Sequence, residues 1–393
     1  MLDLRAHFSR FLNADPDRLH FAAHSHHPWP DVTRNAQAEA WDDAARLMDD
    51  KWERILGPVL EEFQHHVAGH LRLPDPATVA VAPNTHEFLR RILSCFPARS
   101  PVRILTSDGE FHSFARQVAR LEEDGLVVAT RVPAEPFATF DDRFRAAMRE
   151  GHDLVFVSQV FFNSGFAVDI DALAEGAGDA MLVIDGYHGF MARPTDLSRL
   201  AGRAFYIAGG YKYAMAGEGA CFMHCPPGWG MRPRDTGWYA AFGNLARAQE
   251  GKVAYSEDGW RFMGSTFDPS GLYRFNAVMR WLSQQAGIAV AAIHDHALAL
   301  QRRFLDGLGP ASGLSPDALV VPADETRRGN FLTFDMPDAQ PTYARLKALN
   351  VVTDVRGNRL RLGFGIYQTP EEVDALLRRL DGAAAGGRQP AAG

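Results

Sequence analysis

The sequence has few cysteines, no long apolar run and no concentration of basic residues, and each absence excludes a class of protein. Three cysteines in 393 residues are too few for a disulfide framework, which agrees with a reducing compartment. No segment approaches the roughly 18 consecutive apolar residues that a membrane span requires. The net charge is -7 and the basic residues form no stripe, so neither a membrane nor a nucleic acid is an expected partner.

Two local features could suggest a different class, but neither is strong. The first residues, MLDLRAHFSRFLNADPDR, are charged and amphipathic and lack the apolar centre of a secretory signal, so we expect a cytoplasmic protein. Cys221 and Cys225 are four residues apart, in or beside the apolar run GACFMHC. Buried thiols are expected there rather than a metal pair.

What is present is a globular composition with alternating strand and helix patterns. Hydrophobic residues make up 46% and charged residues 23%, and the length allows a large α/β domain plus a smaller one. The expected strands are short apolar runs, several too apolar to have a solvent-facing side. They cover residues 79–82, 102–105, 154–157, 181–184, 204–207 and 220–223. Helical spacing covers residues 87–96, 111–122 and 140–149.

The C-terminal third of the chain predicts a separate, smaller unit. A long helical pattern from 272 to about 308 predicts a helix that leaves the large domain, which we call the spine. Alternating strands and helices are expected after it. The strands are expected at 318–321, 331–334 and 360–364, and the helices at 342–348 and 370–380. The predicted fold class is therefore α/β, with a mostly parallel sheet in the large domain. The expected divisions are an N-terminal arm near the active site at 1–35, the large domain at 36–275, the small domain at 276–382 and a disordered tail at 383–393.

Polar residues that directly follow the apolar runs are the candidates for chemistry, because ligands of α/β sheets bind at the carboxyl ends of the strands. Asp185 follows one buried strand, and Lys212 follows another after a Gly-Gly turn. Asn84, Thr85 and His86 begin a helix, where backbone N–H groups and the helix dipole favour an anion such as phosphate.

These parts match the needs of pyridoxal 5'-phosphate (PLP), which requires an amine for its aldehyde, a carboxylate for its ring nitrogen, an aromatic face and an anion cradle. Lys212 would form the Schiff base and Asp185 would keep the pyridinium protonated. Each residue alone has a commoner explanation, since an Asp at a strand end often caps a helix and a Lys in a glycine-rich turn is usually solvated. The joint arrangement predicts a PLP enzyme.

The same residues carry a family resemblance. Tyr211-Lys212-Tyr213, followed by Gly217 and Gly219, resembles the Schiff-base segment of the class V aminotransferase superfamily of fold-type I PLP enzymes, and within it most closely that of the kynureninases. The resemblance implies that Tyr211 touches the cofactor phosphate. Asp185 and His188 fit the family's Asp-x-x-His, which implies a ring-nitrogen partner and a histidine near the ring and substrate.

Further segments resemble the family's cofactor and interface elements. Phe111 is similar to the residue that stacks on the PLP ring, and Asn84-Thr85-His86-Glu87 is similar to the phosphate turn, with Thr85 the closest match. Gly264-Ser265-Thr266 resembles the element that reaches the phosphate from the neighbouring subunit. The resemblance thus implies a homodimer with shared active sites, in which Ser265 and Thr266 complete the partner's cofactor site.

The substrate end of the site matches the family less closely. Arg361 resembles the arginine that grips a substrate α-carboxylate, with Arg359 and Arg356 as competitors. The arm from His24 to Trp29, in place of the kynureninase Gly-Asn-Ser-Leu-Gly type segment, is expected to shape the side-chain pocket together with Trp238. The arm's histidines have no acidic or cysteine ligand nearby in the sequence, so no metal is expected.

The predicted function is kynureninase-like hydrolysis of a carbon-carbon bond in a small α-amino acid, with Tyr211 and His188 as acid groups. The alternative is amino transfer or β-elimination by a class V aminotransferase or lyase with the same PLP core. A cysteine desulfurase would need a reactive cysteine in the C-terminal part, and no cysteine follows Cys225. A catalytically idle regulator is disfavoured because both Lys212 and Asp185 are present.

Overall fold

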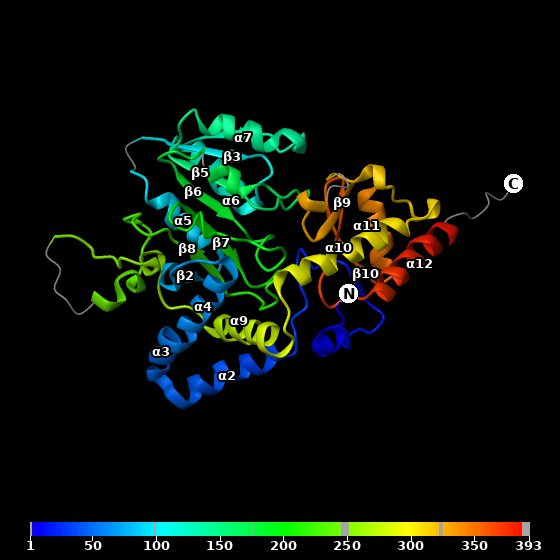
Figure 1. Cartoon of the computed structure of the whole chain (residues 1–393), viewed down its shortest axis with the longest axis horizontal. Coiled ribbons are helices and arrows are strands. Elements are labelled where there is room, and N and C mark those ends of the chain that lie inside the picture. The colour runs from blue at the N-terminus through cyan, green and yellow to red at the C-terminus, as the bar shows by residue number, and fades with distance from the viewer. Residues whose placement is uncertain (1, 98–99, 175, 245–250, 322–324, 387–393) are drawn as a thin grey trace.

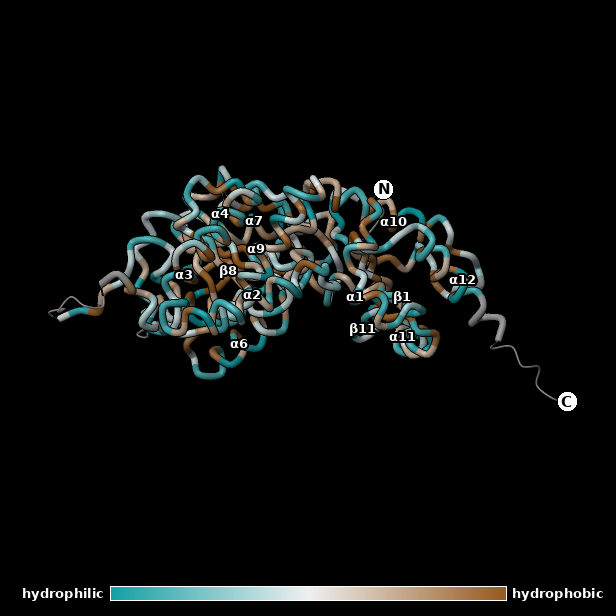
Figure 2. Tube along the Cα trace, turned by 90° about the horizontal axis from the view of Figure 1, so that it is seen from below, coloured by the Kyte–Doolittle hydropathy of each residue, from teal (hydrophilic) through white to brown (hydrophobic). Residues whose placement is uncertain are grey.

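The chain folds into a large α/β domain and a smaller C-terminal α/β domain that lie side by side (Figure 1). This computed structural model describes residues 2–97, 100–174, 176–244, 251–321 and 325–386. Within these ranges, no helix combines the length and the hydrophobicity that crossing a bilayer requires. Hydrophobic stretches concentrate inside the large domain around β8 (Cys221–His224), as Figure 2 shows.

The large domain is built on a seven-stranded sheet in the order β2-β8-β7-β6-β5-β3-β4. Its members besides β8 are β2 (Val79–Ala82), β3 (Val102–Ser107), β4 (Val127–Val132), β5 (Leu154–Ser158), β6 (Met181–Asp185) and β7 (Ala204–Gly209). Only β8 runs antiparallel to its neighbours. Strands β2 and β5 to β8 have scarcely an exposed residue, which is why they lack the alternation of a half-exposed strand.

The helices of the large domain pack on this sheet or on one another. They are α2 (Val32–Leu47), α3 (Lys51–Arg54), α4 (Leu60–Leu71), α5 (Thr85–Ser94), α6 (His112–Glu123), α7 (Phe140–Met148), α8 (Ile170–Ala174) and α9 (Ser270–Arg280). In α6, Phe114 and Val118 are one turn apart and both are buried. Phe114 stacks on Phe156 of β5 with 3.8 Å between ring centroids, which fixes α6 over the sheet.

The small domain contains a three-stranded antiparallel sheet in the order β11-β12-β9. Its strands are β9 (Phe331–Asp335), β11 (Asp354–Arg356) and β12 (Arg359–Gly363), and its helices are α10 (Val290–Asp306), α11 (Ala339–Ala348) and α12 (Pro370–Gly386). A separate core of residues such as Phe304, Leu332, Leu346 and Leu376 holds these elements together.

The N-terminal segment connects the two cores. Phe8, beside the short helix α1 (Ser9–Leu12), is buried in the core of the large domain, whereas Phe21 is buried in the core of the small domain. Between them, β1 (Leu19–His20) pairs in parallel with β10 (Val351–Val352). The segment expected to be an arm is therefore built into both domains.

Most of the expected elements are confirmed, with small shifts at their ends, but four expectations need correction. The strand expected at 318–321 does not form, because this segment contains a single turn of 3-10 helix and one isolated bridge from Leu319 to Phe334. The expected spine is two helices, since α9 ends in a π turn and Gly287 has a positive φ of 63° before α10 begins. Strand β4 was not expected, because its exposed edge gives it few buried residues.

The fourth correction concerns the tail expected from residue 383. Helix α12 continues to Gly386, so residues 383–386 are helical, and the remainder of the expected tail lies outside the described residues. The expected boundary at 275 lies within α9. The next turn also belongs to the large domain, since Trp281 and Leu282 are buried in its core.

Trp29 of the N-terminal segment packs against the loop after Lys212, and this packing requires glycine at position 217. Gly217 has a φ of 72°, and a Cβ built there would lie 2.4 Å from the Trp29 indole. A side chain would therefore meet both an unfavourable backbone conformation and a steric clash.

We expect Gly217→Ala to destabilise the protein more than Gly228→Ala. Both residues have a positive φ, which costs an L-residue about 1 to 2 kcal/mol, but at Gly228 a Cβ would have nothing within 4 Å. The additional loss of unfolding free energy in Gly217→Ala measures the cost of the steric clash with Trp29. Urea unfolding of both variants checks this, and equal losses would contradict the packing argument.

Candidate active site

A cavity of about 530 Å³ lies where the parallel strands end, and we call it the sheet-end cavity. Asp185 is the last residue of β6, Ser158 is the last residue of β5, and Lys212 follows the end of β7. Ser158 and Asp185 are paired in register on adjacent strands, so their side chains enter the cavity from one sheet edge. The wall contains Pro83, Asn84, Thr85, His86, Phe111, Ser113, Ser158, Phe162, Asp185, Tyr187, His188, Tyr211, Lys212, Glu218, Gly219 and Cys221.

The Lys212 amine is a strongly perturbed base in this cavity. Burial lowers its pKa from 10.5 to about 7, an effect that Asp185 opposes and Arg361 increases. Its Nζ lies 4.8 Å from the centroid of the Tyr187 ring and 5.6 Å from those of Phe111 and Tyr211. Aromatic rings thus replace water around the amine, and a substantial fraction of it is neutral, hence nucleophilic, near pH 7.

His188 accepts a hydrogen bond from this amine, with 2.9 Å between Lys212 Nζ and His188 Nε2. Burial, and then the charges of Lys212 and Arg361, lower the pKa of His188 well below its ordinary value. The imidazole is therefore neutral, and its ring nitrogen can accept the hydrogen bond from Lys212.

Asp185 is a buried carboxyl group with one backbone donor. Its Oδ1 accepts a hydrogen bond from the Tyr187 N–H at 2.9 Å, while burial raises its pKa despite the opposing effects of that bond and of Lys212. A carboxylate held this way favours a cationic hydrogen-bond donor inside the cavity, because such a donor would offset the cost of burying its charge.

The N-terminus of α5 forms another part of the wall. Asn84 caps the helix, since its Oδ1 accepts from the Glu87 N–H at 3.1 Å. Thr85 and His86 line the cavity in the first turn, where the helix dipole favours an anion. The Nδ1 of His86 is buried without a partner among the described residues. Together with Lys212, Asp185 and Phe111, this turn supplies an amine, a carboxylate, an aromatic face and an anion-binding helix end.

Five of the expected site residues lie outside the wall of their own chain's cavity, and three of these five are on the surface. Ser265 and Thr266 are exposed to solvent, and Trp238 is 42% exposed and stacks on Tyr239. They belong to other parts of the surface in the single chain.

The expected substrate-binding residues Arg361 and His24 are buried behind the cavity. The guanidinium of Arg361 lies 5.8 Å from the centroid of Phe162, a wall residue, and the His24 ring stacks on Phe331 at 4.6 Å. The competitor Arg359 instead faces Glu135 and Asp335 and is bonded to both. Of these two arginines, only Arg361 is directed toward the cavity.

Sequence reasoning missed three residues at this site. Tyr187 lines the wall, and its hydroxyl lies 3.4 Å from the Cys221 thiol, whose pKa burial raises to about 11. Glu218 lines the wall from the loop after Lys212. Tyr187 lies two residues from Asp185 in the sequence, so proximity to an assigned residue was the available signal.

The third missed residue is Glu110, a buried carboxyl directly behind the wall. Its Oε1 accepts from the Ser107 hydroxyl at 2.6 Å, and its Oε2 accepts from the Ser158 hydroxyl at 2.5 Å. Burial raises the pKa of Glu110 to about 7, and the nearby Asp185 contributes to the rise. Its position beside Phe111 gave no sign that the side chain turns inward.

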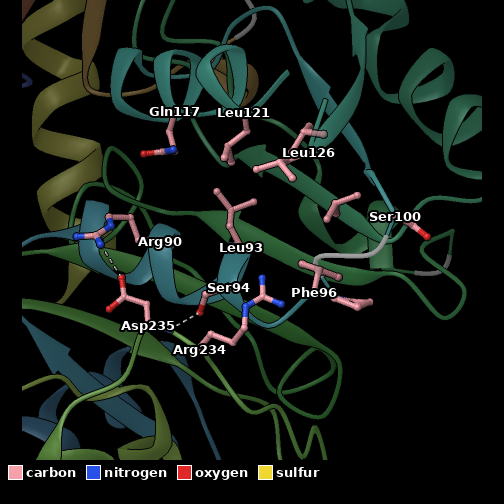
Figure 3. A pocket seen from close by; sticks show the side chains of 13 residues that line it. Arg90, Leu93, Ser94, Phe96, Ser100, Gln117, Leu121, Leu126, Arg234 and Asp235 are labelled. Carbon is pink, nitrogen blue, oxygen red and sulfur yellow. Dashed lines mark hydrogen bonds and ion pairs between the residues drawn. The ribbon is translucent and has the colours of Figure 1, made fainter. Parts of the chain in front are cut away.

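A second hollow, of about 280 Å³, lies between α5, α6 and residues 234–235 (Figure 3). Its wall is largely apolar, and Arg90 forms an ion pair with Asp235 at 3.0 Å. It contains none of the groups expected to carry chemistry. Across the part of the chain that the structure describes, no three His, Cys, Asp or Glu side chains are grouped to hold a metal ion.

Comparisons with known proteins give a family and two similar enzymes. The model of the family described as aminotransferase class-V matches residues 56–376. Kynureninase from Deinococcus radiodurans is 28% identical over 380 residues, which cover 91% of this chain and 85% of that protein. Kynureninase from Pseudomonas fluorescens is 23% identical over 355 residues, or 87% and 79% of the two chains.

Solved structures confirm the expected fold-type I architecture. The apo cysteine desulfurase from Thermococcus onnurineus NA1 superposes with a TM-score of 0.82 over 98% of this chain and 100% of its own, at 17% identity. A variant of C-DES with glycine covalently linked to its PLP cofactor gives a TM-score of 0.80 over 96% and 98%, at 16% identity. At these identities, the likeness concerns the fold alone.

We expect the ionisation of Glu110 to make the free energy of unfolding depend on pH. An unfolded Glu ionises near pH 4.5, whereas the folded carboxyl keeps its proton until about pH 7. The protonated carboxyl therefore makes its full contribution to the free energy of unfolding below pH 4.5. This contribution, roughly 3 kcal/mol, is lost as the pH rises through 7. Glu110→Gln, which cannot ionise, should lack this component.

Urea unfolding of wild type and Glu110→Gln between pH 4.5 and 8 measures the difference. Glu123→Gln, at the exposed end of α6, is the matched control and should follow the wild type. An unchanged pH dependence in Glu110→Gln would show that the carboxyl is ionised throughout.

Proposed function

The chain belongs to the class V aminotransferase family and uses pyridoxal 5'-phosphate, and on this premise we propose that it hydrolyses a carbon-carbon bond in an α-amino acid of the kynurenine type. The observation that carries the proposal is the buried Lys212 amine, 2.9 Å from a neutral His188, in the sheet-end cavity. The similarity to two kynureninases over most of the chain supports this choice of bond.

The residues of the cavity fit the cofactor. Lys212, with a pKa near 7, would take the aldehyde, and Asp185 would pair with the protonated ring nitrogen. Thr85 and His86 would hold the phosphate, a role that the unpartnered Nδ1 of His86 supports. Phe111 would cover the ring. When bound, the cofactor supplies an electron sink for the substrate α-carbon.

Two neighbours of Lys212 are suited to moving protons. His188 is neutral and within hydrogen-bonding distance of the amine, so it can orient the amine through a hydrogen bond while a proton is moved there. Burial raises the pKa of Tyr211 to about 12, so its hydroxyl stays protonated and can donate to a side-chain carbonyl of the substrate. A polarised carbonyl is what water must attack for hydrolysis.

A persulfide reaction of the desulfurase type has no support in this chain. Its three cysteines are Cys95, Cys221 and Cys225, and burial raises the pKa of each, which disfavours the nucleophilic thiolate. One of the similar folds described above is a cysteine desulfurase, but fold likeness does not transfer its chemistry.

We expect purified, PLP-loaded protein to convert kynurenine into anthranilate and alanine, identified by mass. Lys212→Ala should lose at least about 1000-fold in kcat, because it lacks the nucleophilic amine. Lys347→Ala, which removes an exposed lysine of α11, is the control and should keep wild-type rates.

The same assay separates the alternative reactions. A keto acid formed from kynurenine only when pyruvate is present would indicate amino transfer. Pyruvate and ammonia released from other β-substituted amino acids would indicate β-elimination. Either result without anthranilate would reject hydrolysis while leaving the cofactor assignment intact.

We also propose a homodimer in which Ser265 and Thr266 enter the partner's cavity. Both residues are exposed in the single chain and sit just before α9, and the family resemblance assigns such a turn to the partner's phosphate. Exposed Trp238 lies in the same region of the chain and would reach the partner's substrate pocket.

Hybrid dimers test this arrangement. Thr266→Asp should inactivate by repelling the phosphate, and Lys212→Ala should inactivate by removing the amine. Mixed after unfolding and refolding together, the two inactive chains should recover activity, because one hybrid site keeps Lys212 from one chain and Thr266 from the other. No recovery, or a fully active monomer by light scattering, would contradict a shared site.

A further inference from the structure

The guanidinium of Arg361 is already engaged by groups of its own chain. One terminal nitrogen, Nη1, donates to the carbonyl of Phe162, and the other, Nη2, donates to Asp354. Only Nε lacks a partner, and it is buried. Both terminal nitrogens of this arginine, which would bind a substrate carboxylate through two parallel N–H groups, therefore already donate to groups of the protein.

Asp354 lies between an inner and an outer arginine. It pairs with Arg361 across strands β11 and β12, where the two residues are in register, and the Arg361 side chain is 4% exposed. Its other oxygen accepts from Arg356 Nη1 at 2.7 Å, and the Arg356 side chain is 48% exposed. Its remaining neighbour is His24, whose Nε2 lies 3.8 Å from Asp354 Oδ2 and whose pKa burial lowers far below its ordinary value. The two arginines are therefore the charge partners of Asp354 in these contacts.

We propose that Asp354 determines substrate specificity by competing with the substrate α-carboxylate for Arg361. This inference rests on the α-amino-acid substrate of the proposed function and names the residue that sets its carboxylate affinity. A substrate carboxylate that binds the Nε and Nη2 edge of Arg361 competes with Asp354 for Nη2. Ligands with weak or misplaced anionic groups then gain nothing from Arg361.

The outer arginine makes this exchange feasible. When Asp354 releases Arg361, its charge remains paired with Arg356, so no buried carboxylate is left without a cation. Arg361 also keeps the Phe162 carbonyl, and Phe162 belongs to the cavity wall. A small movement of the guanidinium would therefore bring its Nε and Nη2 edge to the cavity.

The test compares two small ligands on the PLP-loaded enzyme, followed by the change in cofactor absorbance. L-alanine has an α-carboxylate whichever side chain the natural substrate carries, and ethylamine is the same molecule without the carboxylate. Asp354→Asn keeps a hydrogen-bond acceptor for Arg361 but removes the competing charge. We expect it to tighten alanine binding roughly tenfold, with ethylamine within about twofold of wild type.

Two further variants make the result decisive. Asp335→Asn removes an acidic partner of the outward-facing Arg359 on the same sheet and should leave both affinities unchanged. Arg356→Leu, on the exposed side, leaves Asp354 with Arg361 as its only guanidinium partner and should weaken alanine binding. This opposite effect keeps the proposal testable even if Asp354→Asn folds poorly.

The outcomes separate this inference from the proposed function. If Asp354→Asn weakens alanine binding or leaves it unchanged, or if both ligands shift equally, Asp354 is structural and the inference fails. If Arg361→Leu does not reduce the preference for alanine over ethylamine, the carboxylate site itself is wrong. Neither result depends on which bond the enzyme breaks, so anthranilate formation is judged independently.

Discussion

The burial of the Lys212 amine is the constraint on which the site depends. A buried ammonium is costly unless it is paired, and here the carboxyl of Asp185 only partly offsets that cost. The result is an amine with a pKa near 7, so near neutral pH both its neutral, nucleophilic form and its protonated form are populated. Its position after β7 follows from the sheet, because β6 and β7 are parallel neighbours and end at the same edge.

The same desolvation sets the protonation of the surrounding groups. His188 is kept neutral, Tyr211 is kept protonated, and Glu110 retains a proton to about pH 7. Burial in one cavity thus holds a neutral imidazole and a protonated hydroxyl near the amine. This arrangement serves any reaction in which protons move at the α-carbon and at a side-chain carbonyl.

The surroundings of Arg361, the residue that we propose binds the substrate, are formed by two domains. Arg361 and Asp354 lie on neighbouring strands of the small domain, and Phe162, which Arg361 contacts, belongs to the large domain. The N-terminal segment adds His24 between them and is anchored in both cores through Phe8 and Phe21. Movement of one domain relative to the other would therefore change the contacts of Arg361.

The sequence by itself determined the parallel strands and the residues that follow them. Strands such as β5 and β6 are buried on both faces, so their apolar runs are visible without an alignment, and Asp185 and Lys212 are located by counting from them. Helix starts were equally visible, since Asn84 is a typical N-cap. Signals of this kind are local. They cover a few successive residues and can be recognised without knowledge of the rest of the chain.

Only the tertiary structure decided which side chains meet across long separations. Edge strand β4 was invisible because its residues are largely exposed, and Gly287 interrupts a helical pattern that looked continuous. The inward turn of Glu110 toward Ser158, and the capture of Arg361 by Asp354, depend on strand pairing and domain packing. Periodicity reports which face of an element is buried, but it carries no information about the partner on the other side.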